Sequence, residues 1–294
     1  MNPFLEVAVE AAREAGEILL AEFDHPAKIS YKGEVDLVTE ADRRSEQAIV
    51  ARLRNHFPKH TIVAEESSWQ ATAPAPDATS LTQGAMLRYC WYVDPLDGTT
   101  NFAHGYPCFA VSIALAENIA AAGIYPGTAR SPLPEDLLVG VVYNPFSGEL
   151  FTGARGEGAF LNQKKIQVSS IERLATSLLC TGFPSVKRTE NPNIHYYWDF
   201  TLRSHGVRRD GSAALDLAAV ACGRFEGFWE FGLKPWDTAA GVLLVREAGG
   251  MATDFTGRPY RLGGPELMAS NKHIHAEMQE VAADIAERAP QRLG

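Results

Sequence analysis

The stretch Asp94-Pro95-Leu96-Asp97-Gly98-Thr99 constrains this chain more than any other, and it follows an apolar run from Met86 to Val93. The run predicts a buried strand. Asp94-Pro95 predicts the end of that strand, because proline cannot continue a central strand. Pro95 and Gly98 are typical turn residues, so we expect both aspartates on one side of a turn. Neighbouring carboxylates repel each other unless a cation compensates them, and Mg²⁺ takes oxygen ligands of this kind.

The residues just after the second acid give the same stretch another possible role. Gly98, Thr99 and Thr100 are expected at the start of a helix, where free backbone N–H groups favour a phosphate. An isolated turn of this composition is more often an ordinary turn than a ligand site. The interpretation therefore depends on the rest of the chain.

Three further acidic positions lie at the ends of predicted elements. Thr39 is expected to cap a helix whose first turn contains Asp42. Glu65 and Glu66 end a short apolar strand, and Asp237 opens a later helix. Each acid has an ordinary explanation as a cap or a solvated loop residue. Together the four clusters indicate one ligand site, and because no Cys or His joins them, a hard metal such as Mg²⁺ or Mn²⁺.

The remaining pattern predicts a chain of mixed helices and strands. Helices are expected over residues 3–23, 39–57, 191–204, 212–222, 237–248 and 272–288. Strands are expected over residues 61–67, 86–93, 108–116, 137–143, 149–152, 177–181, 225–231, 251–255 and 267–270. Residues 69–85 are expected to be a surface loop, and residues 118–136 an irregular insertion.

Weaker signals are present outside the acidic clusters. Gly153, Gly156 and Gly158 have the spacing GxxGxG, which does not match a nucleotide-binding loop. Gly211-Ser212 precedes a predicted helix and is a second possible anion site. Glu230 interrupts an aromatic-rich strand, so it lies either on an exposed face or in a pocket.

Composition excludes several classes of protein. The 294 residues allow one large domain or two of moderate size, and the net charge of −9 argues against a basic nucleic-acid surface. The four cysteines contain no CxxC pair, so reduced thiols are expected. No signal-peptide pattern and no apolar run of membrane-spanning length is visible, which leads us to expect a cytoplasmic protein with no membrane partner.

Taken together, the motifs resemble those of the inositol monophosphatase family, within the metal-dependent, lithium-sensitive phosphomonoesterases. Residues 94–102 are similar to that family's D-P-[IL]-D-G-T-x-N-F signature, and residues 236–241 to its W-D-x-A-A-G signature. Glu65-Glu66-Ser67 and Asp36-Leu37-Val38-Thr39 with Asp42 match two further elements, in the family's order. Ala64 departs from the usual glycine, and the 118–136 insertion is longer than expected.

The resemblance implies a fold and a set of metal ligands. The fold would be an α+β or α/β layered αβαβα sandwich, of the inositol monophosphatase and fructose-1,6-bisphosphatase type. The site would lie between an N-terminal α+β half (1–172) and a C-terminal α/β half (173–294). Three Mg²⁺ positions are implied: one held by Glu65, Asp94 and the Leu96 carbonyl, one held by Asp94, Asp97 and Asp237, and a weaker third that Glu66 supports through water.

Catalytic and substrate roles are implied in the same way. Glu65 and Thr99 would orient the attacking water, and Asp42 would accept a hydrogen bond from Thr99. The substrate would be bound by Gly98, Thr99, Ser212, Ala213, Ala214, Glu230 and Asp237. One metal ion would lower the pKa of the water, and another would neutralise the phosphate and the leaving alkoxide.

The implied enzyme is a Mg²⁺-dependent phosphoric monoester hydrolase acting on a small polyol phosphate, with inositol monophosphate the first choice. Fructose-1,6-bisphosphatase, histidinol-phosphate phosphatase and nucleotide 3′-phosphatase activities share the same chemistry and remain alternatives. A non-catalytic regulatory binding protein is an alternative of another class. Mn²⁺ as a substitute metal, lithium sensitivity and a homodimer are family expectations, whereas the insertion's role and the need for a third metal stay open.

Overall fold

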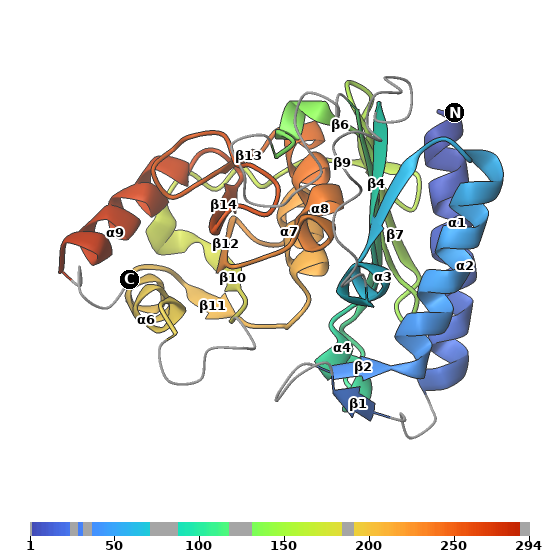
Figure 1. Cartoon of the computed structure of the whole chain (residues 1–294). Helices are drawn as coiled ribbons and strands as arrows, with labels where there is room; N and C mark the ends of the chain where they lie inside the picture. The colour runs from blue at the N-terminus through green and yellow to red at the C-terminus, as the bar shows by residue number, and fades with distance from the viewer. Residues whose placement is uncertain are drawn as a thin grey trace, which may run out of the picture.

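The computed structural model describes residues 2–23, 29–31, 37–70, 88–117, 131–183 and 191–288. Asp36, most of the predicted loop at 69–85 and residues 118–130 of the predicted insertion lie outside the described residues. Two sheets with helices between and outside them make up the described chain, as Figure 1 shows. Within it, no helix is both long and apolar enough to span a bilayer.

The outermost layer is a pair of helices, α1 (Pro3–Phe23) and α2 (Glu40–His56), which pack against each other and against one face of the larger sheet. A short antiparallel pair, β1 (Ile29–Tyr31) and β2 (Leu37–Thr39), precedes α2. Thr39 caps α2 through a capping box with Asp42, as the sequence predicted.

The larger sheet has seven strands in the order β3-β4-β5-β6-β7-β8-β9. Their bounds are β3 (Thr61–Ala64), β4 (Tyr89–Asp97), β5 (Ala110–Glu117), β6 (Leu137–Asn144), β7 (Glu149–Ala154), β8 (Gly158–Leu161) and β9 (Lys164–Ile166). Only β3 and β4 pair in parallel; every other pair of described strands in this sheet is antiparallel. Short helices follow two strand ends, α3 (Glu65–Gln70) and α4 (Thr99–Ala103).

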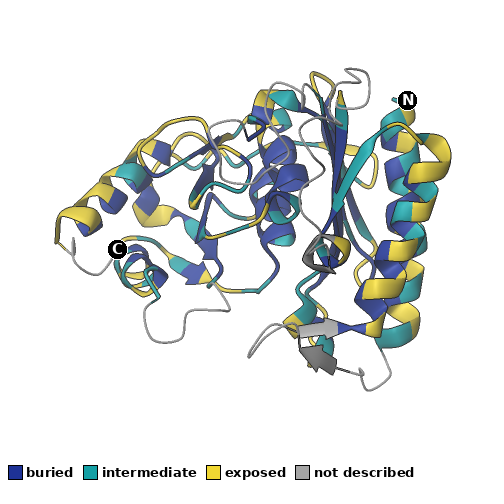
Figure 2. Cartoon of the chain, in the orientation of Figure 1, coloured by how far each residue is buried: buried dark blue, intermediate teal, exposed yellow. Residues whose placement is uncertain are grey.

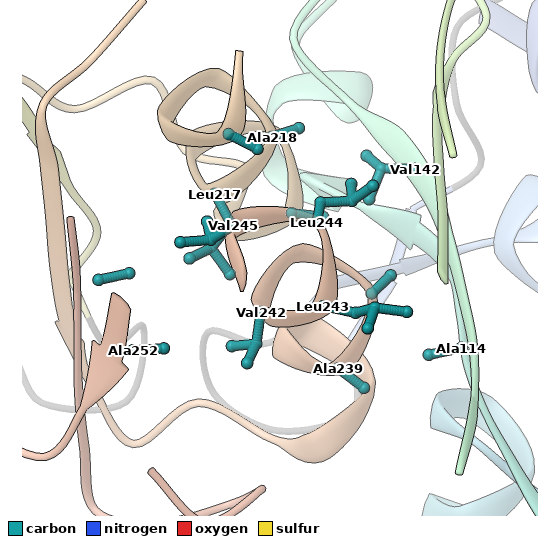
Figure 3. Packing of buried hydrophobic residues seen from close by; sticks show 14 of the residues in the cluster. Ala114, Val142, Leu217, Ala218, Ala239, Val242, Leu243, Leu244, Val245 and Ala252 are labelled. Carbon is teal, nitrogen blue, oxygen red and sulfur yellow. The ribbon is translucent and has the colours of Figure 1, made fainter. Parts of the chain in front are cut away.

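The central layer consists of α7 (Ala213–Ala221) and α8 (Pro235–Glu247), which contact both sheets. Figure 2 shows these two helices mostly buried, whereas α1 and α2 have exposed outer faces. In Figure 3 their aliphatic side chains point towards the β5 and β6 strands on one side and towards Ala252 on the other. The helices approach closely at Gly241, where a Cβ atom would lie 2.5 Å from the Leu217 Cβ.

The second sheet has the order β11-β10-β12-β14-β13. Its strands are β10 (Leu178–Thr181), β11 (Gly206–Arg208), β12 (Gly227–Phe231), β13 (Met251–Thr253) and β14 (Glu266–Ser270). Helices α6 (Asn193–Arg203) and α9 (His275–Arg288) pack on its outer side. The layers therefore form the predicted αβαβα sandwich, while the division into halves at residue 172 stays a prediction.

Several predicted boundaries were wrong. β4 passes through Pro95 and ends at Asp97. Pro95 is tolerated because β3 pairs only as far as Val93, and the register with β5 shifts between Asp94 and Asp97. Glu65 and Glu66 lie in the first turn of α3 and not at the end of a strand. Strands β8, β9 and β11 were not predicted, because three or four residues are too few for a periodic pattern.

One buried histidine adds a pH-dependent term to the stability of the second sheet. His275 is 4% exposed, and its ring nitrogens lie 2.8 Å from the hydroxyls of Thr253 and Ser270. Burial lowers the pKa of His275 from 6.5 to about 4. Because the unfolded chain binds this proton more readily, the contribution is complete above the unfolded pKa and is lost as the pH falls from 6.5 towards 4.

We expect His275→Asn to flatten the pH dependence of the free energy of unfolding between about pH 7.5 and pH 5. The wild type should lose roughly 2 kcal/mol more than the variant over this window, because only the wild type must bury a neutral imidazole. Urea denaturation at each pH measures the difference. His273→Asn is the matched control, since His273 is exposed. Equal slopes for wild type and His275→Asn would contradict the expectation.

Candidate active site

Acidic side chains from three segments meet at one end of the larger sheet. β3 and β4 are parallel, and Ala64 lies opposite Val93. Glu65 and Asp94 are the next residues of the two segments, so they lie at the same end of the sheet. The start of α8 reaches the same place, because Ser112 on β5 donates a hydrogen bond to the Trp236 carbonyl at 3.1 Å. The structure thus brings Asp237 to the acids that the sequence grouped with it.

Burial and mutual repulsion dominate the electrostatics of this cluster. Asp94 is 2% exposed. Burial first, and then the charges of Glu65, Asp97 and Asp237, hold its pKa well above the usual range. Burial likewise raises the pKa of Asp97 to about 6 and that of Asp237 well above its ordinary value. Such a cluster is unfavourable unless protons or a cation compensate it.

Backbone and hydroxyl donors hold one oxygen of each aspartate. The Oδ1 atom of Asp94 accepts from the Leu96 N–H at 3.0 Å, and the Oδ2 atom of Asp237 accepts from the Lys234 N–H at 2.7 Å. Asp237 is the third residue of α8, and its carboxylate accepts from the backbone N–H of the N-cap residue Lys234. The second oxygen of each accepts no hydrogen bond from the described residues, so it is the oxygen available to a cation.

Asp97 links the turn to the start of α7. Its Oδ2 atom accepts from the Ser212 hydroxyl at 2.5 Å and from the Ala214 N–H at 2.7 Å. Ser212 is also the N-cap of α7. The predicted substrate residues Ser212, Ala213 and Ala214 are therefore fixed directly beside a predicted metal ligand.

The donor set fits a hard divalent cation. All the candidate ligands are carboxylate or carbonyl oxygens, which suit Mg²⁺ or Mn²⁺. Within the described ranges, no three Asp, Glu, His or Cys side chains already converge as a ready metal cage.

Thr99 and Asp42 form a short hydrogen-bonded chain beside the carboxylates. The Thr99 hydroxyl lies 3.1 Å from Asp42 Oδ1 and 3.0 Å from the Leu96 carbonyl, so its single proton has two acceptors. Asp42 is 1% exposed and also accepts from the backbone N–H and hydroxyl of Thr39. The Asp42 carboxylate thus accepts hydrogen bonds both from the N-cap of α2 and from the turn at Thr99, two features that were predicted separately.

Gly98 shapes the start of α4. Its φ of +94° is strained for other residues, and a Cβ atom would lie 2.8 Å from the Cys108 carbonyl oxygen. As the N-cap of α4, Gly98 precedes backbone N–H groups that have no partner within the helix. The phosphate contact at Gly98 and Thr99 stays a prediction.

Glu230 lies in the protein interior, so an exposed-face position is wrong. It is 8% exposed and has no hydrogen bond to a described residue. Burial, Asp237 and Asp97 raise its pKa well above the ordinary value. A Cβ atom on Gly182 would lie 2.2 Å from both Glu230 carboxylate oxygens. Only glycine at position 182 leaves room for this side chain.

Sequence reasoning missed Gly182, Asp216 and Glu46. Asp216 is 2% exposed, and its buried Oδ2 atom has no hydrogen-bond partner among the residues that the structure describes. Burial and the charge of Glu230 raise its pKa well above the ordinary value. The one available signal was an acid within the otherwise small and apolar helix 213–221.

A separate cavity of about 1190 Å³ lies between α6, α9 and the end of β12. Tyr196, Phe231 and Phe255 line it, together with parts of α9. Its lining is mainly apolar and contains none of the carboxylates of the cluster. The chemistry of this protein is therefore sought at the carboxylate cluster.

Comparisons with known proteins identify the family of this chain. A model of the inositol monophosphatase family matches residues 1–126 and 134–291. The inositol-1-monophosphatase of Synechocystis sp. is 42% identical over 287 residues, which cover 96% of this chain and 90% of the relative. The Nus factor SuhB of Escherichia coli (strain K12) is 40% identical over 296 residues, which cover 98% of this chain and 100% of the relative.

A solved structure shows the same similarity in three dimensions. The inositol monophosphatase from Anabaena (Nostoc) sp. has a TM-score of 0.77 and 41% sequence identity, covering 96% of this chain and 95% of that one. Enzymes of this family generally use metal ions, which agrees with the oxygen donors gathered here. The chain belongs to the inositol monophosphatase family and is a phosphoric monoester hydrolase.

Proposed function

We propose that this protein is a Mg²⁺-dependent phosphomonoesterase acting on a small polyol phosphate, with inositol monophosphate as the preferred substrate. One observation supports this most strongly: Asp97 directly precedes the N-cap of α4, its carboxylate accepts hydrogen bonds from the start of α7, and its charge acts on the buried Glu230. The carboxylates suit metal ions, the helix starts suit a phosphate, and Glu230 suits the hydroxyls of an alcohol.

The proposed metal ligands are the oxygen donors that the family resemblance implies. Glu65, Asp94 and the Leu96 carbonyl would hold one Mg²⁺, Asp94, Asp97 and Asp237 a second, and Glu66 would support a third through water. When bound, the ions supply charge neutralisation for the phosphate and a water of lowered pKa. Mn²⁺ offers the same preference for oxygen and is a plausible substitute.

Proton transfer is assigned to Thr99 and Asp42. Glu65 and the Thr99 hydroxyl would orient the attacking water. As the Thr99 oxygen receives a proton, its own proton can pass to Asp42 Oδ1, which already lies 3.1 Å away. The N–H groups of Gly98 and Thr99 would hold the phosphate oxygens, and those of Ser212, Ala213 and Ala214 would border the alcohol.

Glu230 favours an uncharged polyol as the alcohol. Its carboxylate accepts hydrogen bonds from hydroxyl groups and would repel a second phosphate, which disfavours fructose 1,6-bisphosphate and nucleoside bisphosphates. Histidinol phosphate carries a cation and remains the closest competitor. These alternatives would keep the same metal ligands.

A regulatory role is the alternative from another class. Relatives 39–41% identical to this chain are named Nus factor SuhB or putative Nus factor SuhB. A binding protein would have no need of the hydrogen bond from Thr99 to Asp42, which prepares a proton acceptor beside the metal ligands. We therefore favour catalysis.

A homodimer in the cytoplasm completes the proposal. Ile194, Trp198 and Leu202 are spaced four residues apart on α6 and are 55%, 67% and 69% exposed. Such an apolar stripe on one helix face is typical of a protein interface. Sensitivity to Li⁺ is proposed from family membership alone.

The test is phosphate release with Mg²⁺ from inositol 1-phosphate, fructose 1,6-bisphosphate, histidinol phosphate and a nucleoside 3′,5′-bisphosphate. We expect the highest kcat/KM for inositol 1-phosphate. Preference for another substrate would be consistent with the same metal site but would indicate a different alcohol. If Mg²⁺ binds but no phosphate is released from any of the four substrates, the regulatory alternative is favoured.

Asp97→Asn and Asp237→Asn should each lower kcat/KM by more than about 100-fold, because a direct ligand contributes at least as much as the surrounding groups that orient it. Circular dichroism should show an intact fold. Asp284→Asn is the matched control, since Asp284 lies on the exposed side of α9. Wild-type rates in either site variant would refute the proposed ligands.

Gly182→Ala should raise KM for inositol 1-phosphate by roughly tenfold, because the new Cβ displaces the carboxylate of Glu230 and loses about one hydrogen bond to substrate. KM for phenyl phosphate, which lacks hydroxyls, should hardly change. Steady-state kinetics on both substrates distinguishes these effects. An equal rise for both would argue against Glu230 as the group that binds the alcohol.

A further inference from the structure

One face of α2 holds three buried polar side chains. Asp42, Ser45 and Glu46 have the spacing i, i+3, i+4 that places residues together on a helix, and they are 1%, 0% and 5% exposed. Buried polar groups require hydrogen-bond partners. The partners of Ser45 and Glu46 lie in the segments that carry the proposed metal ligands, whereas Asp42 binds Thr39 and Thr99. Asp42 was already assigned, whereas Ser45 and Glu46 have no role so far.

Glu46 binds the start of α3. Its Oε2 atom accepts from the Glu66 N–H at 2.7 Å, and its Oε1 atom accepts from the Ser67 N–H at 2.8 Å. The Ser67 hydroxyl donates to the same Oε1 atom. Ala64 directly precedes α3 and has no side-chain oxygen with which to cap it. A carboxylate twenty residues away in the sequence therefore caps this helix in place of a local residue.

Ser45 binds the other ligand-bearing segment. Its hydroxyl donates to the Pro95 carbonyl at 2.9 Å, in a fully buried contact. Pro95 lies between Asp94 and Leu96, both proposed ligands of the same Mg²⁺ as Glu65. Two adjacent side chains of one rigid helix thus hold the backbones of two segments that must supply ligands to a single ion. Figure 1 shows α3 and the end of β4 near α2.

We propose that Glu46, assisted by Ser45, is a positioning residue for the metal site. It fixes the distance between the Glu65–Glu66 segment and the Asp94–Leu96 segment, so that Mg²⁺ affinity depends on a carboxylate that does not itself bind the ion. Both oxygens of Glu46 are already engaged by N–H groups. The inference rests on the proposed metal-dependent function and extends it to residues outside the ligand set.

A carboxylate is required because it accepts at both oxygens. Glutamine keeps one acceptor but turns an NH₂ group towards a backbone N–H, so one of the two bonds is lost. Without the full clamp, α3 samples other positions, and part of the binding free energy of Mg²⁺ is used to restore the right one. Affinity then falls, whereas turnover at saturating Mg²⁺ is largely retained because every ligand is still present.

The experiment measures Mg²⁺ binding by isothermal titration calorimetry on the full-length chain without substrate. Glu46→Gln should weaken Mg²⁺ binding by roughly 10- to 100-fold, the range for groups that orient metal ligands. Its kcat at saturating Mg²⁺ should stay within about threefold of wild type. Ser45→Ala should shift the affinity in the same direction by less, and it provides the test should Glu46→Gln fail to fold.

Glu40→Gln is the matched control. It removes the same charge from the same helix at an exposed position, so its Mg²⁺ affinity should stay within about twofold of wild type. If Glu46→Gln binds Mg²⁺ as tightly as wild type, or no more weakly than Glu40→Gln, the positioning role is overturned and the proposed function stands. If wild type itself binds no Mg²⁺, the proposed function fails together with this inference.

Discussion

Repulsion among buried carboxylates is the constraint on which the rest of this structure depends. Asp94 and Asp97 lie at the end of one strand, and Glu65 and Asp237 are brought to them from two helices. Burial, together with the charges of Glu65, Asp97 and Asp237, raises the pKa of Asp94 well above its usual range. A fold that gathers such groups must hold them by other contacts until a cation arrives. The surrounding hydrogen bonds hold these carboxylates in place.

Those hydrogen bonds come from the layers on either side of the cluster. α2 holds the turn and the start of α3, while Ser212 and the Ala214 N–H of α7 hold Asp97. Each contact uses a backbone group or one carboxylate oxygen and leaves other oxygens for ligands. The sandwich of helices and sheets is therefore more than a scaffold, because two of its helical layers determine where individual carboxylates lie.

Much of this could be predicted from local sequence, and the exceptions share a cause. The cap formed by Thr39 and Asp42 and the strained backbone at Gly98 depend on neighbouring residues, and both predictions were confirmed. The strand through Pro95 was missed because its tolerance depends on where the pairing with β3 ends. The roles of Glu46 and Gly182 depend on their contacts with Glu66 and Glu230, which are distant from them in the sequence. Periodicity and turn chemistry contain no information about such contacts.

The close packing of α8 has a consequence for how the carboxylates of the site are held. At Gly140 of the larger sheet an added Cβ would lie 3.0 Å from the Ala240 carbonyl oxygen, and at Gly241 of α8 it would lie 2.5 Å from the Leu217 Cβ. The helix that has Asp237 in its first turn is therefore closely packed on both sides. The segment around Glu65 is attached through hydrogen bonds instead of interlocked helices. The carboxylates at the start of α3 are thus held in place by side-chain hydrogen bonds from α2, whereas Asp237 is held by the close packing of its own helix.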